Sequence, residues 1–203
     1  MSEQSTRIDD FRSLSDALIA SLRASGAVSG IEVGELAPKF DLPNATGNSV
    51  SLDDRLTQGP VVLSFYRGAW CPYCSRELHE LQEALPQIHS FGASLIAINP
   101  QAPDDSLGLV EKLGLAFEVL SDLDQSVIRA YRLSFDLSEA LQPAYAERGL
   151  DLTKLNANGS WSLPVPATFV IDVDGIVRSR HVDPNYRERM AVSDILSALA
   201  RLT

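Results

Sequence analysis

The sequence has few of the features that mark metal-dependent, nucleic-acid-binding or membrane proteins. It contains only two cysteines and three histidines, which leaves few soft ligands for a transition metal. Its 27 acidic side chains outnumber 17 basic ones, and the net charge of -10 disfavours nucleic acid and anionic membrane surfaces as partners. The chain has no apolar run of the about 18 residues that a membrane-spanning helix needs. We therefore expect a globular protein without metal or organic cofactor.

The first residues also lack the pattern of a secretion signal. A signal peptide has a basic start followed by an uninterrupted apolar core. Here acidic and polar side chains interrupt every apolar stretch of residues 1–26. The sequence therefore predicts a cytoplasmic protein, and in that compartment two neighbouring cysteines are more often catalytic or metal-binding than a structural disulfide.

Apolar periodicity predicts one α/β domain preceded by a helix. Apolar side chains at spacings of three and four predict an amphipathic helix before Gly26, formed around Ile8, Phe11, Leu14, Leu18 and Leu22. We favour packing of this helix on the domain's own surface, and a homodimer contact is the alternative. Downstream patterns predict a hairpin with its turn at 44–48, strands at 60–66, 94–99 and 116–122, a second hairpin at 166–182, and helices at 72–91, 104–115, 124–133 and 189–202.

These patterns divide the chain into an N-terminal helical extension, residues 1–30, and one domain, residues 31–203. The periodicity weakens at 134–160, which we interpret as an insertion. Within it we expect a helix broken at Pro143, because proline inside a helix removes a hydrogen bond. For the helix at 104–115 we expect Asp104 or Asp105 as the N-cap.

Both cysteines lie in one short motif, with only Pro72 and Tyr73 between Cys71 and Cys74. Cys71 follows a predicted buried strand, and Pro72 fits the first position of the next helix. Unpaired N–H groups at a helix start favour an anion, so we expect the pKa of the Cys71 thiol to fall below its ordinary value. We expect Cys74 to lie more deeply buried in the first helical turn. Cys71 would then attack a substrate, and Cys74 would resolve the resulting mixed disulfide or sulfenic acid.

Three other roles for the cysteine pair are less favoured. Two thiols can pack simply as small apolar groups. A zinc site formed by Cys71, Cys74 and His79 would lack obvious further ligands. A structural disulfide within one helical turn would close almost no loop and would stabilise little. Dithiol redox chemistry is therefore favoured, since a Cys-x-x-Cys motif between a strand and a helix is typical of it.

The motifs "AWCPYC" and, about ninety residues later, "PATFVID" resemble those of the thioredoxin superfamily. The segment "GELAPKFDLP" resembles the start of its AhpC/TSA peroxiredoxin branch. This resemblance implies a thioredoxin-like fold, with a central mixed sheet flanked by helices. It implies that Cys71 is peroxidatic and Cys74 resolving, that Pro166 is a cis-proline facing them, and that the Val165 backbone binds an extended substrate.

One position departs from the peroxiredoxin pattern. Typical members carry Thr or Ser three residues before the peroxidatic cysteine, and this chain has Gly68 there. The dipeptide between the cysteines, Pro72-Tyr73, is the one that glutaredoxins use. The scaffold thus resembles a peroxidase, whereas the active-site loop resembles that of a disulfide oxidoreductase.

Peroxide reduction also needs groups that stabilise charge on the leaving oxygen. Arg67 is the best candidate, because it lies in the loop before Cys71, and Arg76 and Arg180 are weaker ones. Substrate or a partner chain would be bound by Trp70, Tyr73 and the Val165-Pro166 turn.

We therefore expect a thiol-dependent antioxidant enzyme that reduces hydrogen peroxide or organic hydroperoxides through a dithiol–disulfide cycle. Thioredoxin or a glutathione/glutaredoxin system would recharge it. The alternative is a thiol–disulfide oxidoreductase that acts on protein disulfides and has little peroxidase activity. A non-catalytic module that senses redox state is a third reading.

Overall fold

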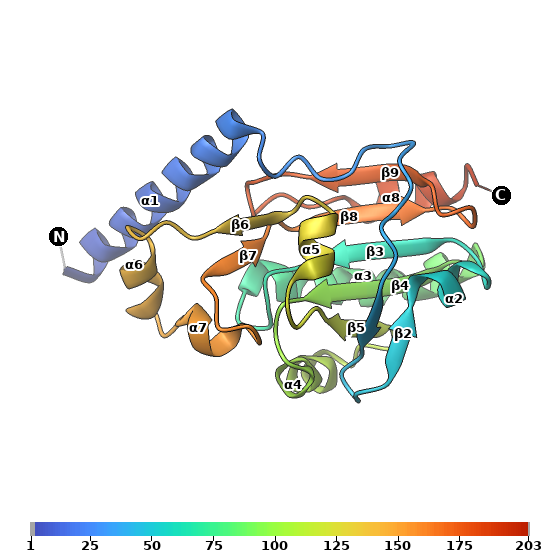
Figure 1. The fold of residues 1–203 in the computed structure, drawn as a ribbon, viewed down its shortest axis with the longest axis horizontal. Coiled ribbons are helices and arrows are strands. Elements are labelled where there is room, and N and C mark those ends of the chain that lie inside the picture. Colours follow the sequence, from blue (N-terminus) through green and yellow to red (C-terminus); the bar gives the residue numbers. More distant parts are fainter. Residues whose placement is uncertain (1–2, 203) are drawn as a thin grey trace.

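A five-stranded mixed sheet forms the centre of the molecule (Figure 1). The computed structural model describes the backbone of residues 3–202 and the side chains of residues 11–202, so the predicted helix position at Ile8 lies outside the described side chains. Four strands run in the same direction, and only β8 among the five runs antiparallel to them. The strand order is β5 (Glu118–Ser121), β4 (Ser94–Asn99), β3 (Val61–Phe65), β8 (Ala167–Ile171) and β9 (Val177–Val182).

Strand β3 lies in the middle of this sheet, and every one of its residues is buried. Its side chains alternate between the two faces of the sheet. Val61, Leu63 and Phe65 join the apolar cluster on one face, and Val62 joins the cluster on the other. The continuous apolar run therefore forms a strand covered on both faces, as the sequence predicts.

Helices cover one face of the sheet, and shorter elements cover the other (Figure 1). The first face packs against the helices α3 (Pro72–Ser90), α4 (Pro103–Leu113) and α8 (Val192–Leu199). The second face packs against the hairpin β1 (Asp41–Pro43) and β2 (Ser49–Ser51) and the helices α2 (Leu52–Leu56) and α5 (Ser126–Ala130). The central mixed sheet flanked by helices confirms the predicted thioredoxin-like fold.

Two details of helix ends differ from the sequence-based expectation, both because of proline. Helix α4 is capped by Ala102 and begins at Pro103, so Asp104 and Asp105 lie in its first turn and neither is the N-cap. Helix α6 (Gln142–Ala146) carries Pro143 in its first turn and is not broken by it. Proline favours the first turn because its fixed φ suits a helix and its missing N–H has no partner there.

A strand ladder that the sequence pattern does not reveal joins the start of the insertion to the residues just after it. Strand β6 (Ser134–Asp136) pairs antiparallel with β7 (Ser162–Pro164), and α6 and α7 (Leu152–Leu155) lie between them in the chain. Each strand has only three residues, which is too short for a clear period-two pattern.

The N-terminal helix α1 (Glu3–Ser25) packs on this insertion, which supports the favoured reading that it covers its own domain. Figure 1 shows α1, α6 and α7 together at one end of the molecule, toward which the carboxyl ends of β3 and β4 point. Their apolar cluster has a core of five residues, with the α1 side chains packed against it: Leu137, Leu141, Tyr145, Leu152 and Leu163, with Phe11, Leu14 and Leu18.

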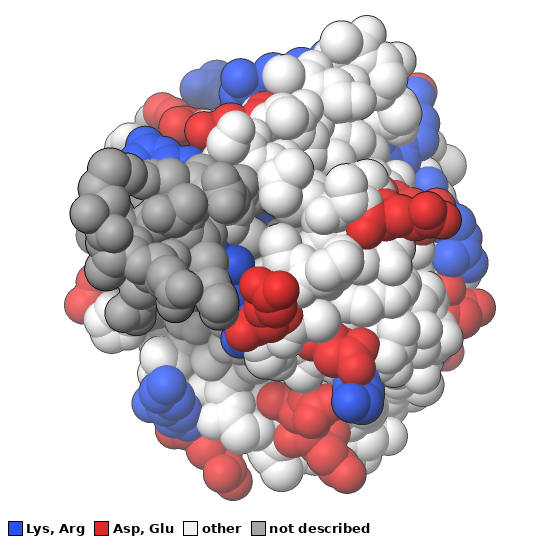
Figure 2. All heavy atoms as spheres, turned by 90° about the vertical axis from the view of Figure 1, so that its left-hand side faces the viewer, with Lys and Arg blue, Asp and Glu red and all other residues white. Residues whose placement is uncertain are grey.

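The surface at this end carries charges of both signs. Figure 2 shows acidic and basic side chains interspersed with wide uncharged areas on the face that carries α1, α6 and α7. None of the helices in residues 3–202 combines the length and apolar character needed to cross a bilayer.

Candidate active site

The loop between β3 and α3 places Cys71 at the start of a helix. Cys71 has an extended backbone and is the N-cap of α3, and Pro72 is the first helical residue. The Cys71 N–H donates to the Gly68 carbonyl oxygen over 3.1 Å, which closes the loop tightly. The predicted strand–Cys-x-x-Cys–helix arrangement is therefore present.

The tight loop explains why Gly68 replaces the hydroxyl residue of typical peroxiredoxins. Gly68 has φ +144°, a conformation that side-chain-bearing residues rarely adopt. A Cβ atom there would lie 2.5 Å from Trp70 Nε1 and 2.8 Å from Gln101 Oε1. Gln101 Oε1 also accepts a hydrogen bond from the Ala69 N–H over 2.5 Å, so it is held in place. The loop as folded has no room for a Thr or Ser side chain.

Both cysteines are free thiols in the described structure, and neither side chain is exposed to solvent. Cys74 nevertheless lies deeper than Cys71, as the sequence predicts, and burial is the largest influence on its pKa but not on that of Cys71. A hydrogen bond from the Cys74 thiol, the charge of Arg67 and the Cys74 N–H together outweigh burial and lower the pKa of Cys71 to about 5. Burial, reinforced by the neighbouring Cys71, raises the pKa of Cys74 well above its ordinary value.

At neutral pH the pair therefore consists of one thiolate and one thiol. Cys71 therefore has the ionised sulfur that the predicted nucleophile needs. The helix-start N–H contributes to its ionisation, but the Cys74 thiol is the larger influence. A thiol that donates to a neighbouring thiolate lies within reach to close a disulfide once Cys71 is oxidised.

Arg67 is the cation beside the nucleophile. Its Nη2 lies 3.1 Å from Cys71 Sγ, and its Nη1 donates to the Tyr145 hydroxyl oxygen over 3.2 Å. The guanidinium lies over the Tyr186 ring, 3.9 Å from the ring centroid, and 5.3 Å from the Trp70 centroid. Burial opposes the charge of Arg67, but the neighbouring Cys71 thiolate raises its pKa, so it stays charged.

A second buried ion pair lies beside Cys74 and was not expected from the sequence. Arg189 Nε donates to Glu77 Oε2 over 2.6 Å, and Arg189 Nη2 lies 3.6 Å from Cys74 Sγ. Burial raises the pKa of Glu77 to about 7, against the opposing effect of Arg189. One signal in the sequence could have revealed Glu77, since it follows Cys74 by three residues and faces the core side of α3 together with Leu81.

An aromatic cavity of about 230 Å³ opens next to Arg67. Its lining comes from four parts of the chain: the active-site loop, α1, the insertion and the segment before α8. Trp70 and Tyr73, both expected to bind substrate, line this cavity. The full lining is Phe11, Arg67, Trp70, Pro72, Tyr73, Tyr145, Arg148, Leu150 and Tyr186.

Aromatic rings pack against one another around the cavity, and Cys71 is not among its lining residues. Trp70 meets Tyr145 edge to face with centroids 6.2 Å apart, and Tyr73 meets Tyr186 in the same way at 5.5 Å. Because Cys71 is buried, a substrate reaches its sulfur only when side chains around the cavity shift.

The expectation for the Val165-Pro166 turn is wrong in two respects. The Val165–Pro166 peptide bond is trans, and the Val165 N–H donates to the Leu133 carbonyl oxygen over 2.8 Å. This amide is therefore not free to bind an extended substrate. The reason is the insertion, because its β6–β7 ladder keeps the chain extended up to β8. Pro166 lies near the site all the same, since it lines a narrow gap together with Arg67.

Arg180, a weaker candidate from the sequence, does not join the site. Its Nη1 donates to the Ile31 carbonyl oxygen over 2.7 Å and pairs with Glu32 at 2.9 Å. These contacts hold the Arg180 guanidinium against residues 31 and 32, at the start of the domain.

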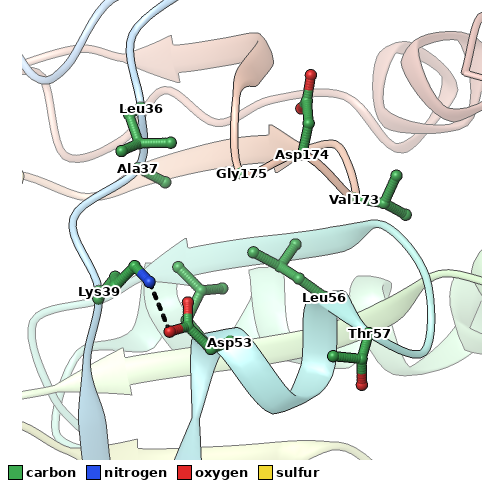
Figure 3. Close-up of a pocket in the computed structure, with 10 residues that line it drawn as sticks. Leu36, Ala37, Lys39, Asp53, Leu56, Thr57, Val173, Asp174 and Gly175 are labelled. Atoms are coloured by element: carbon green, nitrogen blue, oxygen red, sulfur yellow. Dashed lines mark hydrogen bonds and ion pairs between the residues drawn. The ribbon is translucent and has the colours of Figure 1, made fainter.

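Another hollow, of about 430 Å³, lies at the opposite end of the sheet (Figure 3). Asp174 and Gly175 on its rim belong to the β8–β9 turn, which is at the amino end of β3 and away from the cysteines. Figure 3 shows Leu36, Leu56 and Val173 around it, with Lys39 and Asp53 in contact. The charges of Lys39 and Asp53 are paired at 2.7 Å, so the hollow presents no free reactive group among its described lining residues.

The fold and the paired thiols define a thioredoxin-fold dithiol oxidoreductase. The chain belongs to the AhpC/TSA family, whose model matches residues 33–180. A Mycobacterium tuberculosis protein classed among the peroxiredoxins is 30% identical over 142 residues, 70% of this chain and 79% of that protein. The thiol-disulfide oxidoreductase ResA of Geobacillus kaustophilus is 28% identical over 149 residues, 73% of this chain and 68% of ResA.

Solved structures show the same fold. The crystal structure of peroxidoxin BcpB from Mycobacterium tuberculosis aligns with a TM-score of 0.68 at 23% identity, covering 85% of this chain and 99% of BcpB. Peroxiredoxin Q of Xanthomonas campestris aligns with a TM-score of 0.62 at 18% identity, over 80% of this chain and 90% of that one.

Proposed function

We propose that this enzyme reduces hydroperoxides through a cycle of Cys71 and Cys74. The observation that carries the proposal is the ionised Cys71 sulfur, 3.1 Å from Arg67 Nη2 and hydrogen-bonded by the Cys74 thiol. A thiolate is the nucleophile that peroxide reduction needs, and a cation beside it stabilises negative charge as the O–O bond breaks.

The cycle has three steps. The Cys71 thiolate attacks one peroxide oxygen, so an S–O bond forms, the O–O bond breaks, and water or an alcohol leaves after taking up a proton. The product is a sulfenic acid on Cys71. The Cys74 sulfur then attacks the Cys71 sulfur, so an S–S bond forms and the S–O bond breaks. The displaced hydroxide takes up the proton of the Cys74 thiol and leaves as water. An external dithiol reduces the disulfide by exchange and restores both thiols.

We propose a thioredoxin or a glutathione/glutaredoxin system as this reductant and the cytoplasm as the compartment. A disulfide between Cys71 and Cys74 is suited to dithiol exchange because both sulfurs belong to the first turn of one helix. The reductant must gain access to this turn, where Pro72 and Tyr73, the two residues between the cysteines, are exposed.

A second candidate is thiol–disulfide exchange on protein substrates. The observation that favours it is the loop at Gly68, which has no room for the peroxide-binding hydroxyl of typical peroxiredoxins. The relationship to ResA supports the same activity. Both reactions use the Cys71 thiolate, and they differ in the bond that it attacks.

Stopped-flow oxidation of the reduced protein separates the two candidates. We expect hydrogen peroxide or tert-butyl hydroperoxide to oxidise Cys71 much faster than free cysteine, Cys71→Ser to abolish this reaction, and Cys74→Ser to stop at the sulfenic acid. A wild-type rate no higher than that of free cysteine, together with rapid reduction of insulin disulfides, would establish the second candidate.

A further inference from the structure

The proposed reaction needs a proton donor for the leaving oxygen. When a thiolate breaks the O–O bond of an alkyl hydroperoxide, the leaving alkoxide is a strong base and needs a proton. Typical relatives have a hydroxyl three residues before the cysteine, but Gly68 has none and Arg67 is held charged by its neighbours. The Cys74 thiol already donates its hydrogen to the Cys71 sulfur, and burial raises its pKa. A proton donor must therefore come from another part of the chain.

The Tyr145 hydroxyl occupies the place where such a donor would act. Arg67 Nη1 contacts Tyr145 Oη at 3.2 Å and Arg67 Nη2 contacts Cys71 Sγ at 3.1 Å. The two amino groups are neighbours on one planar guanidinium, so they hold the hydroxyl and the sulfur side by side.

The hydrogen of this hydroxyl remains available. In the contact with Arg67, the hydroxyl oxygen accepts and the guanidinium donates, because arginine has no acceptor. Among the described side chains, Tyr145 Oη has no acceptor for its own hydrogen. Tyr145 is 3% exposed, so water seldom competes for that bond. Burial raises the pKa of Tyr145, although Arg67 opposes this, and the hydroxyl is therefore protonated at neutral pH.

The cavity beside this hydroxyl suits the organic part of a substrate. Tyr145 and Arg67 both line the aromatic cavity of about 230 Å³. Its other walls are mainly apolar, with the rings of Phe11 and Trp70 packed against Tyr145. An organic hydroperoxide with its carbon part in this cavity would place its O–O bond toward Arg67, Tyr145 and Cys71.

We propose that Tyr145 is the proton donor to the leaving oxygen of an organic hydroperoxide. The inference rests on the proposed peroxidase function and extends it. The Cys71 thiolate bonds to the terminal oxygen, the O–O bond breaks, and the leaving alkoxide takes the Tyr145 proton to become an alcohol. The sulfur is oxidised to a sulfenic acid, and the peroxide is reduced. The tyrosinate, paired with Arg67, then recovers a proton from water.

The test compares oxidants whose leaving groups differ in basicity. Reduced wild-type protein and Tyr145→Phe are oxidised by tert-butyl hydroperoxide, which releases a strongly basic alkoxide, and by peracetic acid, which releases weakly basic acetate. We expect the variant to react about 10²-fold more slowly with the alkyl hydroperoxide, a typical contribution of general-acid catalysis. Its rate with peracetic acid should stay near the wild-type rate, since acetate leaves without a proton.

A matched control removes a buried tyrosine hydroxyl elsewhere. Tyr131 is buried in the core, where its hydroxyl donates to the Pro38 carbonyl oxygen over 3.1 Å. Tyr131→Phe should react with both oxidants like the wild type. Thiolate titration by ultraviolet absorbance should give similar Cys71 pKa values in Tyr145→Phe and the wild type, which separates proton donation from a change in nucleophile.

A measurement on the wild type makes the test independent of the folding of the variant. Transfer of a proton in the rate-limiting step slows the alkyl hydroperoxide reaction in heavy water and leaves the peracetic acid reaction little changed. Equal rate losses with both oxidants in Tyr145→Phe, no loss with either, or equal solvent isotope effects would overturn the assignment of Tyr145. A wild-type protein that reacts with no peroxide faster than free cysteine would instead overturn the peroxidase function, and with it the assignment.

Discussion

Arg189 lies between the Glu77 carboxylate, 2.6 Å from its Nε, and the Cys74 sulfur, 3.6 Å from its Nη2. The segment before α8 thus places a cation beside Cys74, the proposed resolving cysteine, as the loop after β3 places Arg67 beside Cys71, the proposed nucleophile. Each sulfur of the pair has its own arginine. The two arginines differ in their partners, because Arg189 is paired with a carboxylate and Arg67 with a tyrosine hydroxyl.

The Glu77 carboxylate should make stability depend on pH. Burial raises its pKa from 4.5 to about 7, so between these values the folded protein binds more protons than the unfolded chain. The free energy of unfolding should therefore fall as pH rises from 4.5 to 7, by at most about 3 kcal/mol at roughly 1.4 kcal/mol per pKa unit. Urea unfolding of reduced wild type and Glu77→Gln at pH 4 and pH 8 measures this contribution. A difference between the two proteins that is the same at both pH values would contradict it.

The hydrogen bond from Cys74 should control the ionisation of Cys71. Cys74→Ala removes the donor, and we expect the pKa of Cys71 to rise from about 5. Cys74→Ser is the matched control, because its hydroxyl still donates and should keep the pKa closer to the wild-type value. Ultraviolet absorbance of the thiolate, followed from acidic to neutral pH, gives each midpoint. Identical midpoints in the two variants would show that the Cys74 donor has no such influence.

A side chain at Gly68 should disrupt the active-site loop. In Gly68→Ala the new Cβ would meet Trp70 Nε1 and Gln101 Oε1, and the backbone would also be strained at φ +144°. Gly114→Ala is the matched control, since Gly114 has φ +60° and open space around its Cβ position. The control should lose about 1–2 kcal/mol of unfolding free energy from backbone strain alone. Gly68→Ala should lose more unfolding free energy than the control, and it should also lose most of the rate of Cys71 oxidation. Equal losses of unfolding free energy in the two variants, measured by chemical unfolding, would argue against steric exclusion.

The aromatic cavity should select for bulky substrates. Phe11 contacts the Tyr145 ring with centroids 5.4 Å apart and lies under the Arg148 guanidinium at 4.1 Å. Phe11→Ala would remove one apolar wall, so oxidation by cumene hydroperoxide should slow by roughly tenfold, as for the loss of about 1.4 kcal/mol of apolar contact. Oxidation by hydrogen peroxide should change little because it has no carbon part to bind.

A surface substitution serves as the comparison for that experiment. Val33 is 56% exposed, and Val33→Ala should leave the rates with both peroxides unchanged. The cavity assignment would be wrong if Phe11→Ala slowed both peroxides equally in competition measurements.

Local pattern alone was enough to predict the elements that carry the nucleophile. The apolar run of β3, the proline after Cys71 and the amphipathic face of α3 lie within about thirty residues of one another. Both the burial of a strand and the start of a helix are determined by residues that lie close together in the sequence. The low pKa of Cys71 could therefore be predicted in direction before its surroundings were known.

The rest of the site depends on contacts between residues far apart in the chain. Tyr145 reaches Arg67 across 78 positions, and Arg189 reaches Glu77 across 112. Val165 was expected to bind substrate, but its N–H is held by Leu133 of a neighbouring segment, next to a trans bond at Pro166. Spacing in the sequence does not encode such pairs. The docking of the insertion on the end of the sheet brings Tyr145 to Arg67, and the segment before α8 brings Arg189 to Glu77. For this reason the linear chain was enough to predict the cysteine pair at a helix start, whereas the contact of Arg67 with Tyr145 and the aromatic cavity depend on the tertiary structure.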